Sequence, residues 1–306
     1  MNKKYDAVII GAGVIGSAIS FELSKKGYKT LNIDKNPTSG YGPTAASCAI
    51  IRVHYSTFDG CAIAYEGYHY WKDWENYLEY TDESGLAKFV ECGCMIYRTE
   101  QNKYLDTIIK RAKELNIPHE LWDPKKIESV LPFVDVHQYA PVKSPTNDKF
   151  GSHNAKLLRG SVFFPTAGYI NDPQLSAHNL QRACEAKGGE FLFNSEVKEI
   201  IKENGRASGV ILSDGTKLFS NIIVNVAGPH SMKINQMADV EKAMNIKTRA
   251  LKVEVSHVSS PQNFDYEKSG FVVSDGDIGC YSRPETGNNI LIGSEDPECD
   301  DRIFVD

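Results

Sequence analysis

Three glycines near the amino terminus have the spacing of a phosphate-binding turn. Gly11, Gly13 and Gly16 form a G-x-G-x-x-G motif directly after the apolar run YDAVII. Glycines there let the backbone turn tightly and approach a pyrophosphate, which the N-terminus of a following helix attracts. Asp34 comes 18 residues after Gly16, and a carboxylate at that place can accept hydrogen bonds from a ribose diol. The set predicts a dinucleotide site, with a surface acid at a strand end as the alternative for Asp34.

The segment from Tyr41 to Ser56, YGPTAASCAIIRVHYS, places one arginine in a run of small and apolar residues. A guanidinium offers a planar fork of donors that matches a carboxylate. Arg52 is therefore a candidate for binding an acidic ligand, or alternatively the partner of a structural acid. His54 follows two residues later and is compatible with either a pocket or an ordinary core position.

The elements around the glycine motif indicate how it is positioned. YDAVII predicts a strand buried on both faces, a helical pattern runs to Lys26, and a second strand is expected at 29–33. This strand–helix–strand context is the one that the motif requires. After Asp34 the chain becomes rich in Gly, Pro, Thr and Ser, which disfavours an NAD-type domain that would continue to a third parallel strand.

The α/β pattern resumes in the second half of the chain. A helix is expected over 172–187, followed by a strand, an antiparallel meander with Asn-Gly and Asp-Gly turns, and a final apolar strand at 221–226. Alternating strands between 248 and 304 predict an antiparallel sheet. A parallel unit is thus interrupted after its second strand and completed much later.

The predicted fold class is α/β, or α+β overall. A Rossmann-like cofactor-binding domain is interleaved with an antiparallel-sheet substrate domain. Both domains are expected to be discontinuous. We expect the first at 1–84 and 145–235, and the second at 85–144 and 236–306.

Composition excludes several classes of function. The chain has 306 residues, 41% of them hydrophobic, and a net charge of −6, which lacks the basic excess of a nucleic-acid-binding protein. Seven cysteines form no disulfide framework and no metal-ligand spacing, so we expect no metal and a reducing, cytoplasmic location. The longest apolar run, 7–19, is too short to span a membrane, and no signal peptide pattern precedes it.

The motifs, taken in chain order, resemble those of the FAD-dependent oxidoreductases of the D-amino acid oxidase superfamily. The sarcosine oxidase and dimethylglycine dehydrogenase branch is the most similar. The resemblance covers nearly the whole chain and implies that FAD is the cofactor. It is carried by the glycine motif with Asp34, and by SCAIIR with HYS, AGYINDPQL, ASGVILSDG, NVAGP and YSRPETGNNILIG.

The resemblance also implies roles for individual positions. It makes Arg52 the residue that binds a substrate carboxylate. It places Tyr281 in the substrate pocket, although an aromatic residue there is equally compatible with a core sheet position. It implies that the flavin is contacted by small residues or backbone groups at Thr44, Ala46, Ser47, Val197, Ala227 and Gly228.

Two departures from the family pattern affect the expected activity. The oxidases carry a lysine over the flavin that promotes reaction with oxygen, and Asn289-Ile-Leu-Ile-Gly293 has aliphatic residues there. This favours a dehydrogenase over an oxidase, with an electron acceptor that the sequence does not identify. The family also has a last glycine-rich segment that closes over the flavin, which we expect to follow Asp306 or to be replaced by a partner subunit.

We therefore expect an enzyme that oxidises a secondary or tertiary amine or an α-amino acid, similar to sarcosine or dimethylglycine, by hydride transfer to flavin N5. One alternative is an FAD-dependent 2-hydroxy acid dehydrogenase, in which a base such as His54 would be needed near the hydroxyl. The other is a non-catalytic, flavin-binding subunit of a larger complex.

Overall fold

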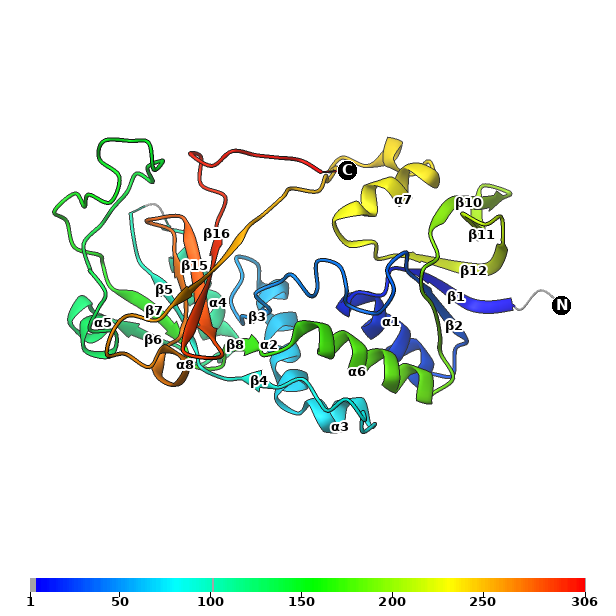
Figure 1. Ribbon diagram of the computed structural model, residues 1–306, viewed down its shortest axis with the longest axis horizontal. Coiled ribbons are helices and arrows are strands. Elements are labelled where there is room, and N and C mark those ends of the chain that lie inside the picture. Colours follow the sequence, from blue (N-terminus) through cyan, green and yellow to red (C-terminus); the bar gives the residue numbers. More distant parts are fainter. Residues whose placement is uncertain (1–3, 101, 306) are drawn as a thin grey trace.

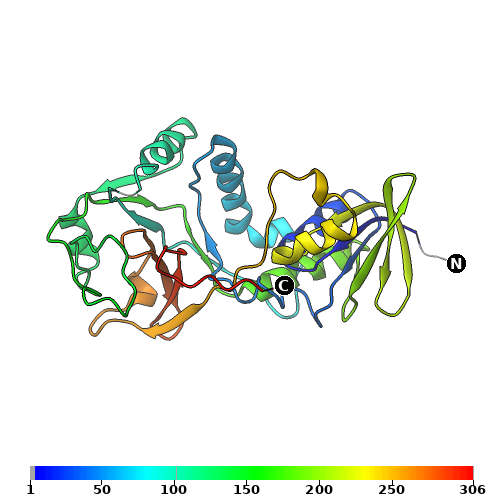
Figure 2. The same cartoon turned by 90° about the horizontal axis from the view of Figure 1, so that it is seen from above.

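The computed structural model describes residues 4–100 and 102–305, which form two lobes at opposite ends of an elongated molecule (Figures 1 and 2). The first lobe contains a six-stranded sheet with the order β10-β11-β12-β1-β2-β9. Neighbouring strands are parallel from β12 through β9, and β10, β11 and β12 form an antiparallel meander. The predicted Rossmann-like unit with its late return is confirmed. Its strands are β1 (Lys4–Ile10), β2 (Thr30–Ile33), β9 (Glu190–Leu192), β10 (Val197–Glu203), β11 (Arg206–Leu212) and β12 (Lys217–Asn225).

Helices cover both faces of this sheet. On one face, α1 (Val14–Lys25) packs against α6 (Pro173–Ala186). The other face carries Leu31 and Ile33, and α7 (Ser231–Met237) packs against their cluster. Asp172 fixes the start of α6 because its side chain accepts a hydrogen bond from the Leu175 amide at 2.9 Å, which satisfies one of the free N–H groups of the first turn.

The second lobe contains a seven-stranded sheet with the order β13-β16-β15-β14-β5-β7-β6. All of its pairs are antiparallel except β14 with β5. The antiparallel sheet that the sequence predicts is therefore present, with one parallel pair where two distant segments meet. Its strands are β5 (Cys94–Tyr97), β6 (Glu120–Trp122), β7 (Ser161–Phe164), β13 (Val255–Ser259), β14 (Val272–Asp275), β15 (Cys280–Glu285) and β16 (Asn289–Ser294).

The position of β7 bears on the expected domain boundary. β7 pairs with β5 on one side and with β6 on the other. Residues 161–164 therefore belong to the seven-stranded sheet, although they follow the boundary expected at 145; the domain bounds as a whole stay a prediction. The four-residue run SVFF fits either sheet by its pattern, because it is apolar throughout and only its pairing assigns it.

The two faces of the seven-stranded sheet have different surroundings. The near face bears Ile96 and Tyr281, and the far face bears Tyr97 and Ser282, as the pairing register requires. Helices α2 and α4 pack on part of the near face, and α5 packs on the far face. The helices of this lobe and of the joint are α2 (Phe58–Lys72), α3 (Trp74–Leu78), α4 (Leu105–Glu114), α5 (Pro124–Val130) and α8 (Tyr266–Ser269).

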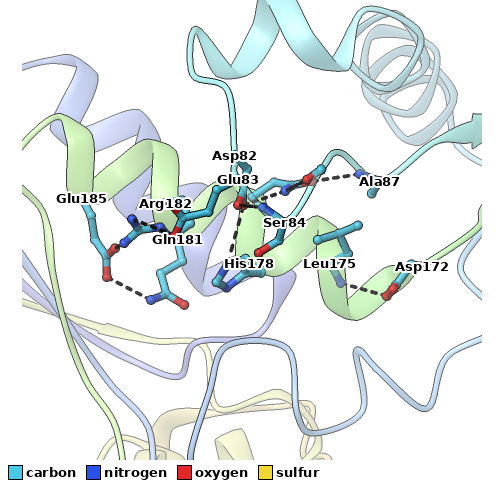
Figure 3. Close-up of polar contacts among 12 residues, drawn as sticks. Asp82, Glu83, Ser84, Ala87, Asp172, Leu175, His178, Gln181, Arg182 and Glu185 are labelled. Carbon is cyan, nitrogen blue, oxygen red and sulfur yellow. Dashed lines mark hydrogen bonds and ion pairs between the residues drawn. The ribbon is translucent and has the colours of Figure 1, made fainter.

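A small three-stranded sheet and a polar loop join the lobes. The sheet has the order β3-β8-β4 and consists of β3 (Ile50–Ile51), β8 (Gly168–Ile170) and β4 (Phe89–Val90). The loop before β4 crosses α6, and Figure 3 shows Asp82 next to His178 on that helix. The Asp82 carboxylate lies 3.6 Å from His178 Nε2. Among the residues just described, no helix is both long enough and apolar enough to cross a membrane.

Asn179 on α6 is the centre of this joint and is fully buried. Its Oδ1 accepts from the Trp74 indole and the Ala87 amide, and its Nδ2 donates to Asp82 and to the Gly85 carbonyl. Asn179→Ala is expected to lower the free energy of unfolding by about 3 kcal/mol, because buried polar groups lose their partners. Urea denaturation measures this change.

A matched control is Asn76→Ala. Asn76 is exposed, and within the described part of the chain its side chain bonds only Asp73. Its replacement should change the free energy of unfolding by less than about 0.5 kcal/mol. Equal effects of the two substitutions would contradict the structural role of Asn179.

Candidate active site

The glycine motif forms a tight turn between β1 and α1. Gly11 has φ of 120°, and a Cβ atom there would lie 2.4 Å from the Val226 carbonyl oxygen. A Cβ atom on Gly16 would lie 2.2 Å from the Gly11 carbonyl oxygen. Neither position accepts a side chain without a backbone shift, so the turn lies tightly against the end of β12.

The N-terminus of α1 faces Thr44. The Thr44 hydroxyl accepts a hydrogen bond from the Val14 amide at 3.1 Å, and a Cβ atom on Gly13 would lie 3.1 Å from the same oxygen. The cap residue, Gly13, has no side-chain cap, and the first turn carries no acidic side chain. Free N–H groups and the helix dipole therefore favour an anion at this end of α1.

Asp34 lies where the sequence predicts, directly after β2. Its carboxylate accepts hydrogen bonds from the Ala12 amide at 2.8 Å and the Asn36 amide at 2.9 Å. These bonds fix the carboxylate beside the glycine turn. Each oxygen retains a lone pair that can accept a ribose hydroxyl.

Asn32 is a residue of this site that the sequence reasoning missed. Its Nδ2 donates to the carbonyls of Gly11 and Gly16, each at 3.1 Å. The buried amide thus ties the glycine turn to β2. A single amide inside the fully buried strand TLNI is the signal that could have identified it.

The returning strands bring further predicted positions close to the glycine turn. The Ala227 amide nitrogen would lie 3.4 Å from a Cβ atom on Gly11. Gly228 follows with φ of 59°, and a Cβ atom there would meet nothing within 4 Å. Val197 is buried at the start of β10, and the segment before it is bonded to Asp34 through the Ser195 amide at 3.0 Å.

Ala46 and Ser47 lie on the loop between Thr44 and β3, and both are exposed. The Ser47 hydroxyl accepts a hydrogen bond from the Ala49 amide at 2.9 Å, and Ala49 has φ of 50°. The loop therefore has a defined shape. Within the described part of the chain, no hydrogen bond joins the side chain of Ala46 or Ser47 to a glycine of the motif.

Arg52 follows β3 and is exposed near the seven-stranded sheet. Its guanidinium lies 4.5 Å from the centre of the Tyr55 ring. None of the ion pairs among the described residues includes Arg52. Glu295 is close enough for its charge to interact with that of Arg52 without forming an ion pair, so both a ligand carboxylate and a structural acid stay possible partners of the guanidinium.

Glu295 is a second residue that the sequence reasoning missed. It follows β16, and its carboxylate accepts a hydrogen bond from the Ser274 hydroxyl at 2.6 Å. Burial raises the pKa of Glu295, while this hydrogen bond and the positive charge of Arg52 act in the opposite direction. The charges of Glu295 and Arg52 therefore interact on the near face. An acid directly after a predicted strand was the available signal.

Tyr281 lies on the near face opposite Gly293. A Cβ atom on Gly293 would lie 2.3 Å from the Tyr281 Cζ atom, so the ring covers this glycine closely. The hydroxyl bonds the Cys48 thiol, and burial raises the pKa of Tyr281 to about 12. The side chain is therefore neutral at physiological pH and held in place between β16 and the segment that leads to Arg52.

Arg283 is a structural residue with 2% exposure. Its Nε donates to the Cys48 carbonyl at 2.6 Å, and its Nη2 lies 2.9 Å from the Glu285 carboxylate. The guanidinium also lies 4.3 Å from the centre of the Tyr169 ring. It links β15 to the Cys48 segment, which leaves Arg52 as the available arginine of this face.

His54 is buried, and its ring stacks on Phe164 with a centroid distance of 4.9 Å. Its Nδ1 has no hydrogen-bond partner within the described part of the chain. Burial lowers the pKa of His54 to about 3, with a smaller contribution in the same direction from the charge of Arg52. The structure thus places His54 in the core beside the near-face site as a neutral residue.

We expect His54 to remain neutral from pH 5 to pH 8, as an NMR titration of its ring protons would show. An unfolded histidine has a pKa near 6.5, so the unfolded chain binds more protons between that value and about 3. The free energy of unfolding therefore falls as the pH decreases through this window, by up to about 1.4 kcal/mol per pH unit.

His54→Phe should remove this slope from the urea denaturation data. His257→Phe, on the exposed strand β13, should leave it unchanged. A His54 ring that titrates near its ordinary pKa would overturn the prediction.

The chain matches the family model described as FAD dependent oxidoreductase over residues 6–304. It belongs to this family. Sarcosine oxidase subunit beta of Rhodobacter capsulatus is 25% identical over 266 residues, which are 85% of this chain and 58% of that protein. Glycine oxidase of Geobacillus kaustophilus is 23% identical over 303 residues, 96% of this chain and 71% of that protein.

Solved structures confirm the fold. L-proline dehydrogenase from P. horikoshii superposes with a TM-score of 0.78 at 20% identity, covering 98% of this chain and 73% of that chain. This chain spans only 58% of the sarcosine oxidase subunit. The similarity therefore establishes the family and the architecture of this FAD dependent oxidoreductase, and the substrate has to be inferred from its own residues.

The glycine turn and the residues around it fit the FAD of the family. Gly11 and Gly16 form a cradle that a side chain would fill, α1 presents a free N-terminus, and Asp34 is fixed beside them. These residues would hold the pyrophosphate and the ribose. Within residues 4–100 and 102–305, no group of three or more His, Cys, Asp or Glu side chains could hold a metal ion.

Proposed function

We propose that this FAD dependent oxidoreductase oxidises a small secondary or tertiary amine that carries a carboxylate, such as an N-methylated or cyclic α-amino acid. The single observation that supports this most directly is Arg52. It is a guanidinium without an ion-pair partner among the described residues, stacked on Tyr55 beside the near face. The names of the relatives, a sarcosine oxidase subunit and a glycine oxidase, are consistent with such substrates.

The residues of the near face divide the work of binding. Arg52 binds the carboxylate with two parallel donors. Glu295, held by Ser274, offers an acceptor to the N–H of a secondary amine. Tyr281 forms a fixed wall. Bound FAD supplies the two-electron acceptor, to which we propose that the substrate carbon next to nitrogen transfers a hydride.

This step needs no strong general base. A neutral amine that loses a hydride becomes an iminium ion, and water then hydrolyses it to a carbonyl compound and a smaller amine. The protein has to orient the substrate and exclude water until then. His54 is not required, in agreement with its burial against Phe164. The same burial disfavours a 2-hydroxy acid dehydrogenase that would depend on this histidine as its base.

We further propose a dehydrogenase rather than an oxidase. Leu291 pairs with Arg283 across β15 and β16 and therefore lies on the near face. The family resemblance implies a lysine in this strand for oxygen-reactive enzymes, and the strand here is aliphatic. A partner subunit is a further part of the proposal, since one relative is itself named a subunit.

The test is an anaerobic titration of the FAD-loaded protein with sarcosine, dimethylglycine, proline and lactate in turn. We expect the visible flavin absorbance to bleach with at least one amine and to return slowly when air is admitted. Bleaching by lactate alone would replace the amine proposal with a hydroxy acid dehydrogenase. Flavin that stays oxidised with every compound would favour a non-catalytic subunit.

A further inference from the structure

The far face of the seven-stranded sheet borders a cavity of about 640 Å³. Ser282 and Ile292 line it from the sheet, whereas their sequence neighbours Tyr281 and Gly293 point to the near face. The sheet therefore separates this cavity from the candidate active site. Its volume lies in the range of about 300–1,000 Å³ that is typical of small-molecule sites.

The walls of the cavity are mostly apolar. Residues from β14, β15 and β16 form one side, and the segment after α5 forms the other. Phe133 and Phe150 belong to that segment, and Ile290 faces them from the sheet side. A ligand in this space would bury an aliphatic or aromatic body.

Three carboxylates, Asp135, Asp275 and Asp277, interrupt the apolar lining, and Asp135 is paired with His137. Asp277 is 1% exposed, and its Oδ2 accepts hydrogen bonds from the amides of Tyr139 and Ala140. Its Oδ1 is buried and has no hydrogen-bond partner among the described residues. Asp275 accepts a hydrogen bond from the Asp277 amide at 3.0 Å. Burial raises the pKa of Asp275 to about 7.

The basic side chains of the cavity are engaged elsewhere. Lys143 Nζ donates to the Tyr139 carbonyl at 2.7 Å, and His137 Nδ1 lies 2.5 Å from Asp135. Neither Asp275 nor Asp277 takes part in an ion pair within the described residues. A buried carboxylate oxygen without a donor is costly, and a cationic donor from a ligand would satisfy it.

We propose that this cavity binds a small organic cation, a primary or secondary ammonium group on an aliphatic or aromatic body. The ammonium group donates to Asp277 Oδ1 and to Asp275, and the body fills the apolar part. The rings of Tyr97 and Tyr266 line the same space and favour a cation over a neutral ligand. A ligand with its own carboxylate is disfavoured, so the site selects amines, in contrast to Arg52 on the near face.

The test uses three probes with the same body: phenethylammonium, 2-phenylethanol and 3-phenylpropionate. Calorimetry with the full chain measures their dissociation constants, and saturation-transfer NMR confirms the contact. We expect phenethylammonium to bind at least about tenfold more tightly than the alcohol, and the acid not to bind in this cavity. The measurement needs neither substrate nor flavin turnover, so its result is independent of the proposed function.

Variants locate the binding. Asp277→Asn should weaken phenethylammonium binding by about tenfold or more. Because Asp277 also holds Tyr139 and Ala140, a second variant is needed, and Ile292→Trp should abolish binding by filling the cavity from the sheet. Circular dichroism checks that both variants are folded.

Asp106→Asn is the matched control, because it removes an exposed acid that pairs with Arg98, and it should leave phenethylammonium binding unchanged. Binding that is kept in Ile292→Trp would place the amine outside this cavity and overturn the proposal. Equal affinity for the amine and the alcohol, or no binding of the amine, would overturn it as well.

Discussion

Arg52→Met is expected to lower kcat/KM for an N-methylated amino acid by about a thousandfold, which corresponds to about 4 kcal/mol. The guanidinium stacks on Tyr55 and forms no ion pair among the described residues, and we propose that the substrate carboxylate is its partner. Methionine keeps most of the side-chain volume but leaves that carboxylate desolvated and unpaired. Steady-state kinetics with an artificial dye as electron acceptor measure the loss.

Two controls separate recognition from general damage. Arg52→Lys keeps the charge but loses the planar fork, so its kcat/KM should lie between those of the wild type and Arg52→Met. Arg98→Met removes an arginine that pairs with the exposed Asp106 at 3.3 Å, and it should leave kcat/KM unchanged. An amine substrate without a carboxylate should be nearly insensitive to Arg52→Met, and equal losses for both substrate types would rule out the assigned role.

Gly11→Ala is expected to abolish the retention of FAD and to lower the free energy of unfolding by about 3 kcal/mol or more. Two causes add. The backbone at Gly11 has φ of 120°, and the new Cβ atom would lie 2.4 Å from the Val226 carbonyl oxygen. The turn must therefore move away from β12 and from the pyrophosphate position. The flavin absorbance per protein after gel filtration measures retention, and urea denaturation measures stability.

Gly27→Ala is the matched control for this change. Gly27 also has a positive φ, 83°, but a Cβ atom there would meet nothing within 4 Å, so only the backbone preference is lost. The cost should be about 1 kcal/mol, with full retention of FAD. If both variants lost the cofactor equally, the close packing of the glycine turn would not be its cause.

Local patterns predicted the fold around the glycine turn well, because its determinants are close in sequence, while the contacts of these residues with FAD stay predictions. The strand, the glycine turn, the helix and Asp34 form one continuous unit whose spacing reports its geometry. The late return of the sheet was also predictable from the apolar strand that ends at Asn225. Asn32 was missed because its role depends on the carbonyl groups of the glycine turn; its amide within a buried strand indicates a hydrogen-bonding role but not the partners.

The substrate lobe was less predictable because its sheet is assembled from distant segments. The strands β6 and β7 have three and four residues, too few for a period to be recognised. Glu295 gained its significance only when β16 placed it beside Ser274. His54 and Arg52 are close in sequence but lie in different surroundings, since the chain turns one toward Phe164 and leaves the other exposed. Their catalytic roles, and that of Tyr281, stay predictions.

The short segment from Thr44 to Arg52 has a fixed length and connects the glycine turn with the seven-stranded sheet. The Thr44 hydroxyl accepts a hydrogen bond from the Val14 amide, and the Cys48 carbonyl accepts one from the buried guanidinium of Arg283. Because Thr44 contacts α1 and Cys48 contacts Arg283 of β15, this segment links the proposed FAD site to the proposed substrate site and sets the spacing between them. We therefore expect substitutions in β15 and β16 to change substrate specificity while the distance between the substrate site and the cofactor site stays constant. Redesign of the protein for a new substrate should therefore vary those strands and leave residues 44–52 unchanged.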